Sequence, residues 1–112
     1  MAMPIEQWSD EVCVARLGDD PQFTEDMTSV DQHLDSHRHA DVILDFSGVT
    51  FLNSTNISRL LTIRQKTIGC DCKLILCGVS TRLWGTFLAT GLDKVFAFSK
   101  DVSTSLATLA IG

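Results

Sequence analysis

The sequence predicts an α/β fold with a mixed, mostly parallel sheet of about five strands and about four helices. Two observations support this prediction. Short apolar runs, which suit buried strands, alternate with segments whose apolar residues recur every three or four positions, as on one face of a helix. Strands that alternate with helices imply right-handed crossovers between parallel strands. No repeat, linker or low-complexity tract interrupts this order, so residues 1–112 are expected to form one domain.

The first elements are two short strands and a helix. Residues 5–8 and 12–17 are largely apolar and flank a polar turn, which predicts a hairpin whose first strand pairs antiparallel at an edge of the sheet. Residues 18–21 (GDDP) then break the strand pattern. Apolar residues at steps of four, three and four predict the buried face of the next helix: Phe23, Met27, Val30 and Leu34.

The central segment, residues 41–68, combines a strand, a loop and a helix. The apolar residues 42–44, with Phe46, predict a buried strand. Four residues with helix-capping side chains follow: Asn53, Ser54, Thr55 and Asn56. The helix is expected to bury the stripe Ile57, Leu60, Leu61, Arg64 and Ile68, and to stop at Gly69. Ser54 therefore lies where the free N–H groups of a helix start attract negative charge.

The remaining elements are two strands and two helices. Residues 73–77 and 95–98 predict strands. Ser80 is expected to cap a helix that Gly91 ends, and Ser99 or Asp101 to cap the closing helix. The apolar residues of these helices are Leu83, Trp84, Phe87 and Leu88 in one, and Val102, Leu106 and Leu109 in the other. Trp84 lies off the main apolar stripe, so it is either a core residue or an exposed anchor.

Composition and charge restrict the classes of partner. The formal net charge is −5, with nine basic residues scattered among fourteen acidic ones, whereas nucleic-acid binding needs clustered Lys and Arg. No apolar run approaches the roughly 18 to 20 residues that cross a bilayer, and the N-terminus lacks the features of a signal peptide. We therefore expect a cytoplasmic protein without membrane insertion and without a nucleic-acid partner.

Cysteine and histidine residues offer alternative chemistry. Cys13, Cys70 and Cys77 lie in or beside apolar runs, which predicts buried, reduced thiols. Cys70 and Cys72 are expected to share a face, but their spacing is not that of a thioredoxin-like site. His33 and His37 have the spacing of metal ligands on a helix, with His39 or Asp41 nearby. The alternative, which we favour, is a polar helix end where histidine suits the dipole.

Enzymatic activity is not predicted. The sequence contains no Ser-His-Asp or Cys-His arrangement and no Gly-rich phosphate loop, so we expect neither a cofactor nor a bound metal. A small thiol or metal enzyme is the alternative from another class, and Cys70 or His37 would then carry its activity.

Two motifs in the central segment resemble the signature of a known family. Residues 45–49 (DFSGV) close the predicted strand, and residues 51–55 (FLNST) lead into the helix. They look like the Asp-x-Ser-x-Val pattern and the Asp-Ser-Ser/Thr-Gly tetrapeptide of STAS domains, which are named for sulphate transporters and anti-sigma factor antagonists. Residues 73–79 and 89–92 resemble the second half of that family. The resemblance extends from about residue 12 to residue 109 and implies a STAS-like fold.

The resemblance also implies a function and a site. In anti-sigma factor antagonists, the first serine of the tetrapeptide is phosphorylated by a partner serine kinase that is also the anti-sigma factor. Only the unphosphorylated form binds that partner. The corresponding serine here is Ser54, with Thr55 as the fallback acceptor. A phosphoryl group adds about −1.5 to −2 charge at a helix start that tolerates it, so it would switch binding without refolding the domain.

The tetrapeptide departs from the family pattern at two positions. Asn53 replaces the aspartate, and Asn56 replaces the glycine. The first change removes a charge beside the acceptor, and the second adds a side chain where close approach would be easiest. Two alternatives therefore stay open. Ser54 is only a helix N-cap, or the protein is a non-phosphorylated STAS adaptor or scaffold, such as the partner of a lipid-transport ABC ATPase or a member of a stress-signalling assembly.

A partner-binding surface is expected around Ser54. Its predicted residues are Asp19, Asp20, Asn53, Thr55, Asn56, Ser58 and Arg59. The alternative for the two aspartates is a solvated turn, and the alternative for Arg59, together with Gln65 and Lys66, is a solvated helix face.

Overall fold

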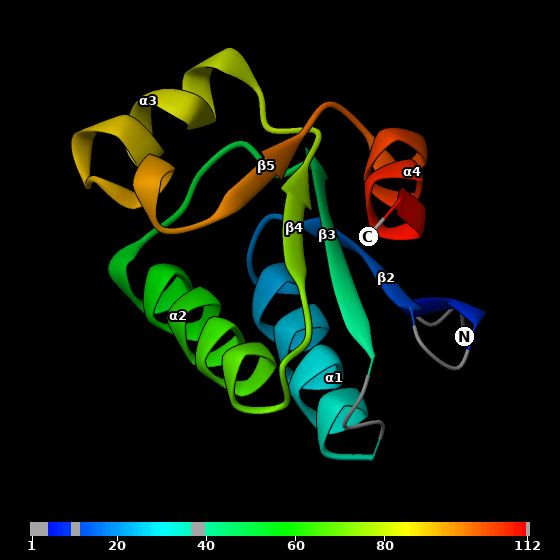
Figure 1. Cartoon of the computed structure of the whole chain (residues 1–112). Coiled ribbons are helices and arrows are strands. Elements are labelled where there is room, and N and C mark those ends of the chain that lie inside the picture. The colour runs from blue at the N-terminus through cyan, green and yellow to red at the C-terminus, as the bar shows by residue number, and fades with distance from the viewer. Residues whose placement is uncertain (1–4, 10–11, 37–39, 112) are drawn as a thin grey trace.

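The computed structural model describes the side chains of residues 12–36 and 40–110, and the backbone of residues 5–9 and 111 in addition. It confirms the α/β prediction (Figure 1). The elements in chain order are β1 (Ile5–Ser9), β2 (Val12–Gly18), α1 (Gln22–Ser36), β3 (Asp41–Gly48), α2 (Ser54–Gly69), β4 (Leu74–Cys77), α3 (Thr81–Ala89), the 3-10 helix η1 (Leu92–Lys94), β5 (Ala97–Ser99) and α4 (Val102–Ile111).

The five strands form one sheet in the order β1-β2-β3-β4-β5. β1 pairs antiparallel with β2 at the edge, and the other three pairings are parallel, as the alternation of strands and helices predicts. β3 is the central strand, and its residue Ile43 pairs with Val14 on one side and Ile75 on the other. The loop that follows β3 therefore leaves from the carboxyl-terminal edge of a parallel sheet, where binding sites collect in such folds.

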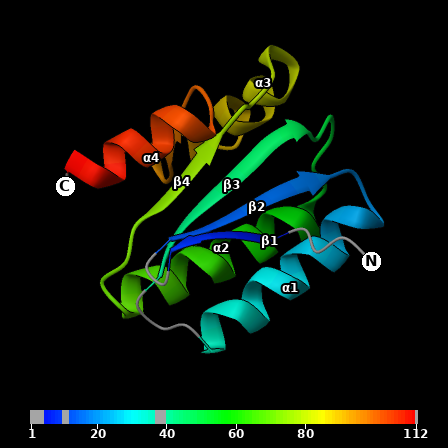
Figure 2. The same ribbon diagram turned by 90° about the vertical axis from the view of Figure 1, so that its right-hand side faces the viewer.

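Helices cover both faces of the sheet. Figure 2 shows α1 and α2 on one face and α4 on the other. Because alternate strand residues point to opposite faces, β3 contributes Val42, Leu44 and Phe46 to the larger core and Ile43 to the smaller one. The ring of Phe46 lies 6.3 Å from that of Phe23 in α1. The smaller core packs Val14, Ile43 and Cys77 against the α4 residues Val102, Leu106 and Leu109.

The buried face of α2 differs from the predicted stripe. Its buried residues are Asn56, Leu60, Ile63 and Thr67, again at steps of four, three and four. Leu61 and Ile68 were expected in the core, but they are 37% and 53% exposed. The prediction was wrong because it counted apolar residues only, whereas two positions of the buried face are polar and meet hydrogen-bond partners.

The helix α2 ends at Gly69, as predicted, but Gly69 is not the residue that turns the chain. Gly69 is still helical, and the left-handed residue is Asp71 with a φ of 58°. The N–H of Asp71 donates to the carbonyl of Ile68 (3.1 Å), and the N–H of Cys72 donates to the carbonyl of Thr67 (2.8 Å). These two bonds are the Schellman pattern, with aspartate where glycine is usual.

Gly69→Ala is expected to raise the free energy of unfolding by about 0.5 to 1 kcal/mol, because alanine has the higher helix propensity. A Cβ at this position would have no heavy atom within 4 Å. Gly91→Ala is the matched control. Gly91 has a φ of 74°, so alanine there should lower the same quantity by about 1 kcal/mol. Urea denaturation measures both changes, and an equal loss in the two variants would contradict the helical assignment of Gly69.

The caps of the last two helices agree with the sequence pattern. The Oγ of Ser80 accepts from the N–H of Leu83 (3.1 Å), and Gly91 ends the segment in the left-handed region. Asp101, rather than Ser99, caps α4, because its Oδ1 accepts from the N–H of Thr104 (2.8 Å). That bond is the main reason that the pKa of Asp101 lies below its usual value.

One detail of this half of the chain differs from the prediction. The 3-10 helix η1 precedes the last strand, which begins at Ala97 rather than at residue 95. Leu88, an apolar residue of α3, is 52% exposed. Trp84, in contrast, is half-buried, and its ring lies 4.8 Å from the ring of Phe98. It therefore belongs to the aromatic part of the core and is not an exposed anchor.

Candidate partner-binding site

Ser54 is the first residue of α2 and its side chain is exposed. The N-cap of the helix is Asn53, whose backbone is extended. Its Oδ1 accepts from the N–H of Asn56 (2.8 Å), and the Oδ1 of Asn56 accepts from the N–H of Asn53 (3.0 Å). This reciprocal pair is a capping box in which asparagine serves at both positions. The interpretation of Ser54 as the N-cap is therefore wrong.

The hydroxyl of Ser54 has no hydrogen-bond partner within the part of the chain that the structure describes. The two asparagines beside it satisfy the helix start instead. Ser54 therefore contributes little to the stability of the helix, and its hydroxyl is accessible to another protein.

Asp20 holds the starts of α1 and α2 together. Its Oδ2 accepts from the Nδ2 of Asn56 (2.9 Å) and, at 3.5 Å, from that of Asn53. Its Oδ1 accepts from the N–H and the Oγ1 of Thr24 in α1 (3.0 and 2.7 Å). These bonds, with that from Asn56 as the largest contribution, lower the pKa of Asp20.

The Asp20 contacts explain both departures from the family tetrapeptide. Asn56 is only 2% exposed, and its side-chain amide donates a hydrogen bond to the Asp20 carboxylate. A glycine at position 56 would supply neither this donor nor the acceptor for the N–H of Asn53. An aspartate at position 53 would place a second carboxylate beside Asp20, and the like charges would repel each other.

Asp19 organises the loop between β3 and α2. Its Oδ1 accepts from the N–H groups of Thr50 (2.8 Å) and Phe51 (3.3 Å), and its Oδ2 accepts from the Oγ1 of Thr50 (2.6 Å). The side-chain bond from Thr50 is the largest reason that the pKa of Asp19 is lowered. Neither aspartate is simply part of a solvated turn, because both carboxylates shape the loop that presents Ser54.

The other predicted residues of the surface are less connected. Thr55 and Ser58 are exposed. Arg59 is half-buried and lines a groove of about 220 Å³ between α1 and α2, together with Met27, Thr28, Asp31, Thr62 and Ile63. None of the other predicted partner-binding residues lines that groove. The structure thus brings the two aspartates and two asparagines into one network and leaves Arg59 outside it.

Phe51 is a surface residue that the sequence pattern did not identify. It lies in the loop three residues before Ser54 and is 67% exposed, while its neighbours Val49 and Leu52 are buried. In the sequence the three are equally apolar, so nothing there distinguishes Phe51 from its buried neighbours. The alternation of buried and exposed residues in an irregular loop follows from tertiary packing and has no sequence signal of its own.

The cysteine and histidine residues were considered as a thiol or metal site. Cys13 and Cys77 are buried, and burial raises the pKa of each to about 11. Cys70, expected to be buried, is only half-buried. His37 and His39 lie outside the described residues, so the proposed ligand pair with His33 is not tested. Among residues 12–36 and 40–110, no three His, Cys, Asp or Glu side chains are grouped so that they could hold a metal ion.

In the part of the chain that the structure covers, none of the helices is both long and apolar enough to span a bilayer.

Comparison with known proteins identifies the family. The model of the STAS domain matches residues 21–105. A serine-to-glutamate variant of Moorella thermoacetica RsbS superposes with a TM-score of 0.81 at 16% sequence identity, covering 98% of this chain and 96% of that one. An anti-sigma-factor antagonist (STAS) domain protein from Planctomyces limnophilus gives 0.81 at 18% identity, with 95% and 97% covered. Phosphorylated SpoIIAA, a Bacillus cell fate determinant, gives 0.73 at 16%, with 96% and 99% covered.

No curated protein sequence matches the chain. At identities below 20%, the solved structures establish the fold, and the family model, which covers most of the chain, establishes the membership. The order of strands and helices agrees with this membership, as does the position of the tetrapeptide, residues 53–56, between β3 and α2. The chain belongs to the STAS domain family.

Proposed function

We propose that the protein is a regulatory binding module of the anti-sigma factor antagonist type. It engages an anti-sigma factor with serine kinase activity in the cytoplasm, and phosphorylation of Ser54 releases that partner. The observation that carries the proposal is the exposed Ser54 hydroxyl at the start of α2, which has no role in capping because Asn53 and Asn56 satisfy the helix start. A solved protein with the same fold is described in a phosphorylated form, which supports the choice of a phosphorylation switch.

The electrostatics of the site suit a switch by charge. The capping box binds the N–H groups of Asn53 and Asn56 but not those of Ser54 and Thr55. A phosphoryl group on the first residue of α2 would lie beside these remaining N–H groups at the positive end of the helix dipole, so the helix can accept it. The carboxylates of Asp19 and Asp20 anchor the same loop, so the neighbourhood is already acidic. A partner adapted to a neutral hydroxyl would then meet an additional anion, and the interface would have to desolvate it.

Phe51 supplies an apolar contact for the same partner. Its ring is 67% exposed in the loop that leads to Ser54, and exposed aromatic residues are frequent anchors of protein interfaces. The proposed interface therefore combines Phe51, Ser54 and the exposed Thr55 with the rim formed by Asp19 and Asp20. The protein acts by binding, and none of these residues is assigned a catalytic role.

A pull-down from a lysate of the source cell tests the proposal, with wild-type protein, Ser54→Ala and Ser54→Asp as baits. We expect a protein with a kinase-type ATPase domain on the first two baits and its loss from the third. Thr55→Asp is the matched control for the fallback acceptor, and it should release less partner than Ser54→Asp. Recovery of one partner by all baits, or of an ABC ATPase, would contradict the switch and favour the adaptor.

The adaptor or scaffold is the second candidate function. It is favoured by the aspartate and asparagine network, because Asp20 ties the loop to α1 and gives the tetrapeptide a structural role that glycine would not have. In that case Ser54 would stay unmodified when the protein is incubated with lysate and ATP, and phosphopeptide mapping would measure this directly.

A further inference from the structure

Cys70 and Cys72 lie at the end of α2 with their sulfur atoms 2.7 Å apart. The thiol of Cys70 donates toward the sulfur of Cys72. An S–S bond is about 2.0 Å long, so the two atoms would need to approach by less than 1 Å to reach bonding distance. Both side chains are half-buried, whereas Cys13 and Cys77 are buried. The function proposed above does not involve this pair.

The backbone turn, rather than strand alternation, brings the two thiols together. Asp71, between them, adopts the left-handed conformation with a φ of 58°. The N–H groups of Asp71 and Cys72 are tied to the carbonyls of Ile68 and Thr67. Because these bonds hold the turn, little conformational entropy would be lost when the two sulfurs join.

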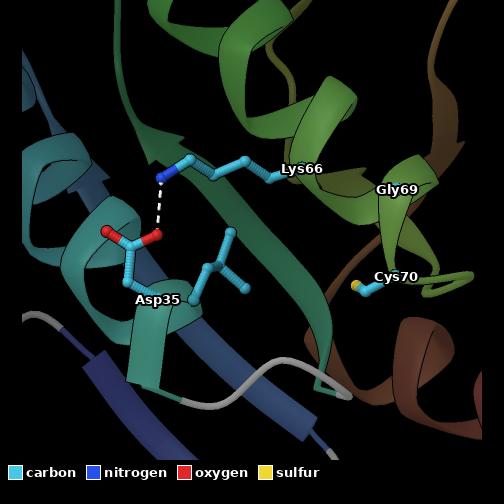
Figure 3. Close-up of a pocket in the computed structure, with 5 residues that line it drawn as sticks. Asp35, Lys66, Gly69 and Cys70 are labelled. Atoms are coloured by element: carbon cyan, nitrogen blue, oxygen red, sulfur yellow. Dashed lines mark hydrogen bonds and ion pairs between the residues drawn. The ribbon is translucent and has the colours of Figure 1, made fainter.

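A surface pocket gives access to Cys70. It has a volume of about 200 Å³ and is lined by Leu34, Asp35, Lys66, Gly69 and Cys70. Figure 3 shows the sulfur of Cys70 directed toward this pocket, with the ammonium of Lys66 bound to Asp35 (2.8 Å) on its other side. Gly69 adds no side chain to the wall of the pocket. The space beside it is open, because a Cβ there would have no heavy atom within 4 Å. A small oxidant can therefore approach Cys70 from solvent.

We propose that Cys70 and Cys72 are a redox-modification site, a dithiol that small disulfides such as oxidised glutathione convert to an intramolecular disulfide. In the first step, the Cys70 thiol gives its proton to water and its sulfur attacks the oxidant, forming a mixed disulfide and releasing one glutathione. In the second, Cys72 gives its proton to water and its sulfur attacks that of Cys70, which breaks the mixed disulfide. Each glutathione leaves as a thiolate and takes up a proton from water. The protein loses two electrons and two protons, which the two glutathione molecules carry away.

The surroundings of the two thiols set the order of the steps. Burial, followed by the hydrogen bond from Cys70 and the negative charges nearby, raises the pKa of Cys72 to about 12. A thiol with so high a pKa is a poor first nucleophile at neutral pH, because little of it is thiolate. Cys70, which lines the pocket, is therefore the attacking residue, and Cys72 is the resolving one.

This site is independent of Ser54. The helix α2 separates them, and its 16 residues span about 24 Å at a rise of about 1.5 Å per residue. Oxidation would change the turn between α2 and β4 without entering the proposed partner surface. Failure of either proposal therefore leaves the other standing.

The test equilibrates the full-length reduced protein in buffers of oxidised and reduced glutathione. The reaction is quenched with acid, the protein is unfolded and alkylated, and tryptic peptides are weighed by mass spectrometry. Cleavage after Lys66 and Lys73 yields residues 67–73, which contain Cys70 and Cys72 but no other cysteine. We expect this peptide to lose both alkylation sites and two hydrogens, while the peptides of Cys13 and Cys77 stay alkylated as internal controls.

Two variants check the order of attack. Cys72→Ser should hold one glutathione on Cys70, because the resolving thiol is absent. Cys70→Ser should acquire severalfold less glutathione on Cys72 in the same time. A wild-type peptide that keeps both alkylation sites under the most oxidising buffer would overturn the proposal. So would a peptide that carries glutathione without forming the internal bond. The wild-type result needs no variant to fold.

Discussion

Asn56→Asp is expected to lower the free energy of unfolding by about 3 kcal/mol. Asn56 is only 2% exposed, and its amide donates to Asp20 at 2.9 Å. The substitution removes that donor and buries a carboxylate that faces another carboxylate. It leaves the acceptor for the N–H of Asn53 in place, so the loss reports on the contact with Asp20 and not on the capping box. Urea denaturation at neutral pH measures the change.

A charge exchange provides the control for this prediction. Combining Asn56→Asp with Asp20→Asn restores one amide and one carboxylate across the same contact, so the double variant should recover at least half of the lost stability. The destabilisation of the single variant should also shrink in acid, because a raised pKa lets the introduced carboxyl bind a proton and then donate to Asp20. If the changes in the free energy of unfolding of the two single variants simply add in the double variant, the two residues are not coupled.

If the proposed function holds, Ser54→Asp is expected to weaken binding to the proposed anti-sigma partner by about 30-fold or more. An unpaired carboxylate in an interface costs roughly 2 to 5 kcal/mol, and about 1.4 kcal/mol corresponds to a tenfold change in Kd. The same variant should keep its free energy of unfolding within about 1 kcal/mol of the wild type, because aspartate suits the first turn of a helix. Calorimetric titration of the purified partner and urea denaturation measure the two quantities.

Ser103→Asp is the matched control for the Ser54 variant. Ser103 is exposed in the first turn of α4, which covers the opposite face of the sheet from α2 (Figure 2). It receives the same charge in the first turn of a helix, as the second residue of α4 where Ser54 is the first of α2, so any general effect of acidity should appear in both variants. An equal loss of affinity in the two would mean that overall charge, and not the surface around Ser54, determines binding. No loss in either would argue against the switch.

The two asparagines change what the tetrapeptide does for the domain. They cap the start of α2, and Asp20 connects this start to α1, so Ser54 does not act as a cap. We therefore expect the loop to keep its conformation in Ser54→Asp. The titration and the urea denaturation of Ser54→Asp together test whether a charge at this position changes binding without changing stability.

Much of the fold could be predicted because its signals are local. The hairpin at the edge, the parallel strands, the caps at Ser80 and Asp101 and the stop at Gly91 all follow from the period of apolar residues and from side chains next to each helix end. The buried face of α2 was predicted less well, since Asn56 and Thr67 are polar residues that the core accepts only with their partners.

The α/β class, the order of the elements and the position of Ser54 at the start of α2 can be read from the sequence, because they depend on neighbouring residues. That Asn53 rather than Ser54 is the cap, and that Phe51 is exposed, became clear from the folded structure. The same holds for the pairing of Asp20 with Asn56, a contact between residues 36 apart in the chain. Such contacts form when packed strands and helices bring distant segments together, and no local pattern records them.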